Sequence, residues 1–108
     1  MKGEATFAIS PQHPAFPGHF PAIPIVPGVV LLDEMLRIIE MAHHCPIAQC
    51  SIAWAKFRST VGPGETLSLH YEQRPDRTIA FVIRAAGRVA ADGVVALSLT
   101  GTEAPNGP

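Results

Sequence analysis

Cysteine is scarce in this sequence, which argues against a disulfide-rich domain and against a cysteine-based zinc site. Cys45 and Cys50 are the only cysteines among 108 residues, which is too few for a disulfide framework. Their spacing with His43 and His44, interrupted by Pro46, fits no common zinc pattern. We therefore expect neither a disulfide-stapled domain nor a metal centre.

Net charge and long apolar runs are lacking as well. The formal charge of −1 gives no electrostatic reason to bind nucleic acid or an acidic membrane surface. No apolar run approaches the roughly 20 residues that span a bilayer, and Met1–Glu4 begins no signal peptide. We therefore expect a cytoplasmic protein.

The length indicates one small domain over residues 1–108, with a flexible Pro/Gly-rich tail at 103–108. A domain of this size buries only about two-thirds of its unfolded surface. Because the chain is also rich in apolar residues, we expect it to complete its core by pairing with a second copy.

Proline, by contrast, is abundant in one stretch, at positions 11, 14, 17, 21, 24 and 27. Each ring fixes its own φ and disfavours helix at the preceding residue, so residues 11–26 are predicted to form a stiff extended strap. Pro27 suits the first turn of a helix. The residues from Gly28 to about His44 are apolar on nearly all sides, which predicts a buried helix, and Pro46 ends it.

The rest of the chain is typical of strands joined by turns. Alternation places Leu67, Leu69 and Tyr71 on the inner face of one strand, and Ala48, Cys50, Ile52 and Trp54 together on one face of another. Ala91-Asp92-Gly93 has the composition of a hairpin turn, and Gly87 is a candidate bulge. The predicted strands are 4–10, 47–59, 65–72, 78–89 and 94–102. One helix and five strands in this order indicate an α+β fold, with an antiparallel sheet curved around the helix.

Residues 16–35 read FPGHFPAIPIVPGVVLLDEM. They resemble the signature of the β-hydroxyacyl-acyl-carrier-protein dehydratases, which have the hotdog fold. Gly18-His19-Phe20 is followed by a proline-containing loop and by Pro27-Gly28-Val29. Asp33 then stands fourteen positions after His19. A second block, AKFR at 55–58 with PGETL at 63–67, is similar to another segment of that family.

The resemblance implies a dehydratase that converts 3-hydroxyacyl thioesters of acyl carrier protein or coenzyme A to trans-2-enoyl thioesters, without a cofactor. His19 would remove the C2 proton, since imidazole titrates near neutrality, and Asp33 would assist departure of the hydroxyl. The Gly28 N–H, at the positive end of the helix dipole, would polarise the thioester oxygen. In the family, the His and the acid come from different protomers of a homodimer. The acyl tunnel is expected to be lined partly by Phe16, Phe20, Val29 and Leu32.

Each residue also has a structural interpretation. His19 could order the strap by binding a carbonyl, and Gly28 could be only a turn residue. Asp33 could pair with Arg37 one turn on, which would lower the pKa of Asp33 and weaken it as an acid. Glu34 projects about 100° away from Asp33 around the helix and is the weaker candidate.

At the level of function, a hotdog thioesterase and a non-catalytic acyl-carrier-binding subunit remain alternatives. Four basic residues could meet an acidic carrier or a phosphate, or could be scattered surface charge: Lys56, Arg58, Arg74 and Arg77.

Overall fold

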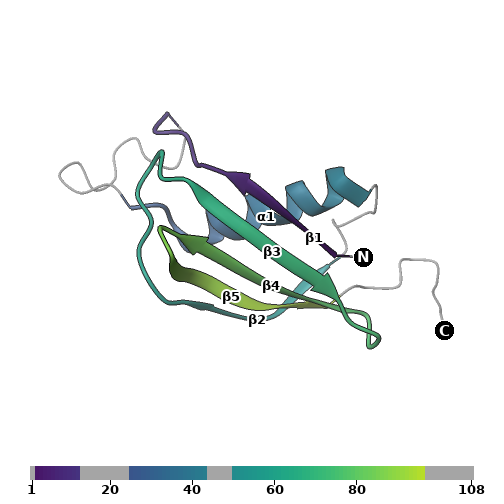
Figure 1. Cartoon of the computed structure of the whole chain (residues 1–108). Coiled ribbons are helices and arrows are strands. Elements are labelled where there is room, and N and C mark those ends of the chain that lie inside the picture. Colours follow the sequence, from purple (N-terminus) through teal and green to yellow (C-terminus); the bar gives the residue numbers. More distant parts are fainter. Residues whose placement is uncertain (1, 13–24, 44–49, 97–108) are drawn as a thin grey trace.

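A computed structural model of the chain describes residues 2–12, 25–43 and 50–96. The elements follow in the order β1 (Lys2–Phe7), α1 (Gly28–His43), β2 (Ser51–Phe57), β3 (Leu67–Gln73), β4 (Thr78–Ala85) and β5 (Arg88–Ala96). The strands form one antiparallel sheet in the order β1-β3-β4-β5-β2, and α1 lies along one face of it (Figure 1). Consequently β1 and β2 are the two edge strands.

The core lies between the sheet and the helix. The predicted inward residues Leu67, Leu69 and Tyr71 are buried, which confirms the alternation of β3. They share one cluster with the buried side chains of α1 and of the next two strands. The helix contributes Leu31, Met35 and Ile39, β4 contributes Ile79, Phe81 and Ile83, and β5 contributes Ala91 and Val95.

The helix begins and ends close to where the prolines predict, but it is buried along one face rather than all round. Leu31, Met35 and Ile39 are four residues apart and face the sheet. Val29 and Met41 are each 65% exposed, because the sheet covers only one side of α1. No helix in the described ranges has the length and apolarity needed to cross a bilayer.

The hairpin between β4 and β5 lies six residues earlier than predicted. Ala86 and Gly87 form the turn, both with positive φ (50° and 80°), whereas Asp92 and Gly93 lie inside β5. A Cβ at residue 93 would lie 2.9 Å from Ala55 Cα and 3.0 Å from the Phe81 ring. Gly93 is therefore required for close packing within the sheet, and the predicted Asp-Gly turn is wrong.

Strand β2 contains an irregularity that the alternating pattern does not reveal. The register shifts between Ile52 and Trp54, which pair with the adjacent residues Val95 and Val94 of β5. Successive residues of β5 point to opposite faces of the sheet, so Ile52 and Trp54 do not share a face. The prediction for these two residues is wrong because a bulge adds one residue to the strand. Ala48 lies outside the described residues.

Candidate active site

The start of α1 presents backbone N–H groups without partners inside the helix. Val30 and Leu31 both donate to the carbonyl of Pro27, at 3.0 and 3.4 Å. Gly28 and Val29 precede them, so their N–H groups have no intrahelical acceptor. These groups carry the positive end of the helix dipole, and a substrate oxygen placed there would be stabilised as negative charge develops.

The side chain of Phe57, at the end of β2, lies against Gly28. A Cβ built at residue 28 would be 2.6 Å from two atoms of the Phe57 ring. The ring is 52% exposed in the single chain, and the neighbouring Val29 is exposed as well. The helix start is thus flanked by accessible apolar surface, which suits an acyl group better than water.

Asp33 lies one turn after Val29, on the same side of the helix, and it is exposed in the single chain. The guanidinium of Arg37 instead forms an ion pair with Glu34, and it also donates to the sulfur of Met41 at 3.3 Å. The hydrogen bonding of the Arg37 guanidinium to the carboxylate of Glu34, which accepts it, is the main cause that raises the pKa of Arg37. The alternative in which Arg37 pairs with Asp33 is therefore wrong, and Arg37 does not bind the carboxyl group of Asp33.

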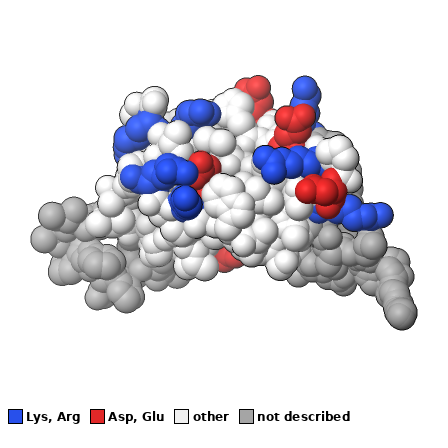
Figure 2. Space-filling model, turned by 90° about the horizontal axis from the view of Figure 1, so that it is seen from below, with Lys and Arg blue, Asp and Glu red and all other residues white. Residues whose placement is uncertain are grey.

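The four basic residues do not form one patch. At one end of β2, Phe57 pairs with Ala91 of β5. At the other end, Ser51 pairs with Ala96, and Ala96 also pairs with Thr78, which follows the β3–β4 turn. Lys56 and Arg58 therefore lie at the opposite end of the sheet from Arg74 and Arg77. Arg58 is further engaged by Asp92, at 2.9 Å. Figure 2 shows charges of both signs toward two ends of one face, with uncharged surface between them.

Some of the predicted site residues lie outside the described residues, namely His19, Phe16 and Phe20. The structure brings together Gly28, Val29 and Phe57, and it places Asp33 one turn further along α1. Leu32, predicted to line the tunnel, is partly buried against the core. Within the described ranges, no three His, Cys, Asp or Glu side chains gather as metal ligands.

Comparison with known proteins identifies the family of the chain. The family described as "ApeI-like: ApeI dehydratase" matches residues 2–94. The chain belongs to the ApeI-like dehydratases. It is also 32% identical over 95 residues to the 3-hydroxyacyl-[acyl-carrier-protein] dehydratase FabZ of Gluconacetobacter diazotrophicus, covering 80% of this chain and 58% of that protein. The FabZ of Solibacter usitatus is 34% identical over 92 residues, which are 78% of this chain and 56% of that protein.

This ApeI-like chain therefore spans less than two thirds of the length of these curated relatives. Solved structures add the fold. An uncharacterized protein from Erwinia carotovora subsp. atroseptica superposes with a TM-score of 0.75 at 25% identity, over 90% of this chain and 82% of that one. The dehydratase heterocomplex ApeI:P from Xenorhabdus doucetiae gives 0.72 at 23% identity, over 88% and 85%. The hotdog fold implied by the sequence motif is confirmed.

Two features of the region around the start of α1 escape sequence reasoning. The contact of Phe57 with Gly28 joins residues 29 positions apart, although the AKFR block marks Phe57 as part of a motif. The pairing of Arg37 with Glu34 rather than Asp33 is also not decided by spacing, because residues three and four positions apart are both neighbours on a helix.

Proposed function

We propose that the protein dehydrates 3-hydroxyacyl thioesters, carried on acyl carrier protein or coenzyme A, to trans-2-enoyl thioesters in fatty-acid or related acyl-chain synthesis. The observation that carries the proposal is the helix start at Gly28, whose N–H has no acceptor within the helix and which is flanked by Val29 and Phe57, both exposed apolar side chains among the described residues. A thioester oxygen can meet the backbone N–H there while the acyl chain contacts the apolar side chains. Membership of a dehydratase family supports the same reaction.

In the proposed mechanism, His19 accepts the proton from C2 of the substrate, and the electron pair of that bond forms the C2–C3 double bond. Negative charge that develops on the thioester oxygen is stabilised by the Gly28 N–H. The C3 hydroxyl leaves as water after Asp33 donates a proton to it. The reverse reaction, hydration of an enoyl thioester, uses the same groups with the roles of acid and base exchanged.

The proposed active form is a homodimer in which each site takes His19 and Asp33 from different protomers. Edge strand β2 supports it, because Ile52, Trp54 and Phe57 are exposed along this strand. Among the described residues no further strand pairs with the outer side of β2, and an edge strand with apolar side chains is a template for pairing with another chain. A two-fold axis beside β2 would pair the strand with its own copy and extend the sheet. A cytoplasmic location is part of the same proposal.

The test is to incubate the purified protein with short trans-2-enoyl thioesters of coenzyme A and of acyl carrier protein. We expect hydration to the 3-hydroxyacyl thioester, identified by mass spectrometry. His19→Ala and Asp33→Asn should each lower the rate by about 100-fold or more. Glu34→Gln is the matched control: it removes the adjacent carboxylate, which is engaged by Arg37, and it should leave the rate unchanged.

Two other outcomes would refute the proposed dehydratase activity. A free acid and a free thiol would identify a thioesterase. A folded dimer that binds the acyl thioester without turnover would identify a binding subunit.

A further inference from the structure

The turn between β2 and β3 contacts both described ends of the segment that joins β1 to α1. Gly64 N–H donates to the carbonyl of Ile9 at 2.8 Å, and Val26 N–H donates to the carbonyl of Val61 at 2.8 Å. Ile9, Val26 and Val61 are all buried in the main core cluster. One turn thus fixes where the chain leaves β1 and where it enters α1.

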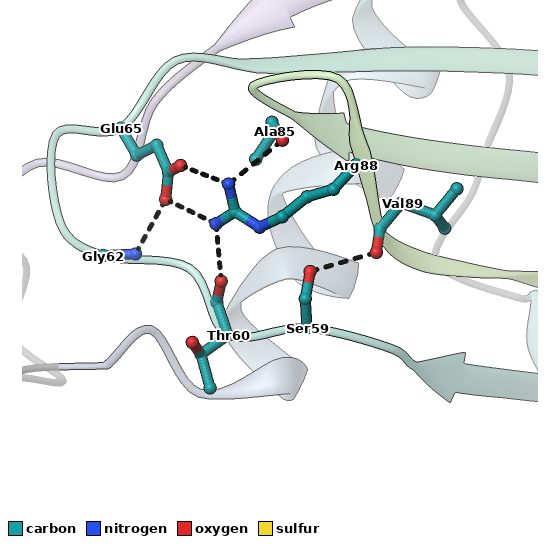
Figure 3. Close-up of polar contacts among 7 residues, drawn as sticks. All are labelled: Ser59, Thr60, Gly62, Glu65, Ala85, Arg88 and Val89. Carbon is teal, nitrogen blue, oxygen red and sulfur yellow. Dashed lines mark hydrogen bonds and ion pairs between the residues drawn. The ribbon is translucent and has the colours of Figure 1, made fainter.

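The turn is itself held by a guanidinium from the β4–β5 hairpin (Figure 3). Arg88 forms an ion pair with Glu65, at 3.0 Å, and donates to the carbonyl oxygens of Thr60 and Ala85, at 2.8 and 3.1 Å. Glu65 also accepts the N–H of Gly62 at 3.1 Å. We call Arg88, Glu65 and the carbonyl of Thr60 the Arg88 clasp. A planar guanidinium can bind a carboxylate and two carbonyls at once, whereas a lysine ammonium offers no such fork.

The clasp is connected to the start of α1 through the turn at 60–65 and Val26. Arg88 and Glu65 shape the turn, and the turn holds Val26 through the carbonyl of Val61. Pro27, which lies between Val26 and Gly28, has a fixed φ. The position of Val26 therefore largely determines the position of Gly28. A displacement of about 1 Å at a reacting centre can cost about 100-fold in rate. The clasp can therefore affect catalysis without touching substrate.

We propose that Arg88 is a positioning residue, which acts through Glu65 and the turn at 60–65 to fix the Gly28 N–H at the start of α1. This proposal rests on the proposed dehydratase function. The side chains of Arg88 and Glu65 are 42% and 27% exposed, and ion pairs so open to solvent contribute little to global stability. The effect of losing the clasp should accordingly fall on the rate more than on the folding equilibrium.

The experiment compares Arg88→Ala, Arg88→Lys and Glu65→Gln with the full wild-type chain, using a short enoyl thioester of coenzyme A. We expect Arg88→Ala to lower kcat about tenfold with a change in KM below about twofold, because the Gly28 N–H acts mainly on developing charge. Arg88→Lys should recover only part of the loss. By NMR hydrogen exchange, the amides of Val26 and Gly64 should lose protection in Arg88→Ala while amides in the centre of β4 keep theirs.

Arg84→Ala is the matched control. Arg84 is an exposed arginine on β4, and within the described ranges it forms no bond with the turn at 60–65. It should leave kcat and the exchange rates unchanged. Should Arg88→Ala fail to fold, Glu65→Gln, which keeps the shape of the side chain, carries the same readouts.

Two results would overturn the proposal: wild-type kcat in Arg88→Ala, or a fall in kcat that merely follows a loss of protection throughout the sheet. An inactive wild-type protein would instead refute the proposed function. The exchange rate of the Val26 amide would then still decide whether Arg88 holds the start of the helix.

Discussion

Gly28 and Phe57 lie side by side at the start of α1, where the proposed mechanism places the thioester oxygen of the substrate. The ring of Phe57 occupies the space of a side chain at residue 28, and it is half exposed in the single chain, so its outer end can shift. A methyl group at residue 28 would therefore be accommodated by the fold. The same methyl group would crowd the surface beside the backbone N–H that is proposed to bind the thioester oxygen.

We predict that Gly28→Ala lowers the hydration rate by about tenfold or more, with little change in the urea midpoint of unfolding. The double variant Gly28→Ala/Phe57→Leu removes the clash with the ring, and Phe57→Leu alone is its control. If Gly28 serves the approach of the substrate, the double variant stays slow relative to Phe57→Leu. Recovery to the rate of Phe57→Leu would show that the glycine only makes room for the ring.

At the scale of elements, the β4–β5 hairpin contains an avoidable strain. Ala86 adopts a φ of 50°, in the left-handed region that alanine disfavours and asparagine tolerates. Since Gly87 already has the positive φ that follows in such a turn, Asn-Gly would suit it. We predict that Ala86→Asn stabilises the protein by up to about 1 kcal/mol in urea unfolding. Ala86→Val should destabilise it, and equal stability of the two variants would contradict the assigned turn.

The Arg88 clasp makes the stability of the folded protein depend on pH through Glu65. Hydrogen bonds from Arg88 and Gly62 lower the pKa of Glu65 from its ordinary value of 4.5. A carboxyl with a lowered folded pKa stabilises the protein fully above its ordinary pKa, and this contribution is lost as the pH falls through the folded value. We predict that the stability difference between wild type and Glu65→Gln is constant near neutral pH and shrinks below about pH 4.5.

Urea unfolding at a series of pH values measures this difference. Acid unfolding of wild type also includes other carboxyls, among them Asp76, whose pKa is lowered by Thr78. Subtraction of the Glu65→Gln curve removes those shared contributions. A stability difference that grows as the pH falls would contradict the assigned pairing.

At the scale of the whole molecule, the two sheet edges differ in what they expose. Strand β2 exposes Ile52, Trp54 and Phe57, whereas β1 exposes Lys2, Glu4 and Thr6. If the protein forms the proposed dimer, we predict that Ile52→Lys shifts it to a monomer in sedimentation velocity and lowers the hydration rate with it. Thr6→Lys places the same charge on the other edge and should leave the dimer intact. A wild-type protein that is monomeric at micromolar concentration would contradict the dimer.

Sequence reasoning succeeds where one residue type determines the local structure. Pro27 and Pro46 bracket the helix, and the clean alternation of Leu67, Leu69 and Tyr71 identifies the inner face of β3. The family motif supplies the hotdog topology, which periodicity alone does not distinguish from other α+β folds.

Sequence reasoning fails where contacts between residues far apart in the sequence determine the local structure. Two dipeptides compete for the last hairpin, and the packing of Gly93 against β2 decides in favour of Ala86-Gly87. The bulge in β2 depends on its pairing with β5. The Arg88 clasp joins Arg88 to residues 23 and 28 positions away, so no spacing in the sequence points to it. His19, on which the proposed proton transfer depends, lies outside the described residues.

The indole of Trp54, on the exposed edge strand, is the one tryptophan in the chain, and it is 46% exposed. Its fluorescence therefore reports on a single place. If copies associate along β2, the emission of a concentrated solution should shift to longer wavelength on serial dilution, as water reaches the ring. The dissociation constant could then be read from unlabelled protein with an ordinary fluorimeter, and a spectrum that does not change with concentration would place the contact elsewhere.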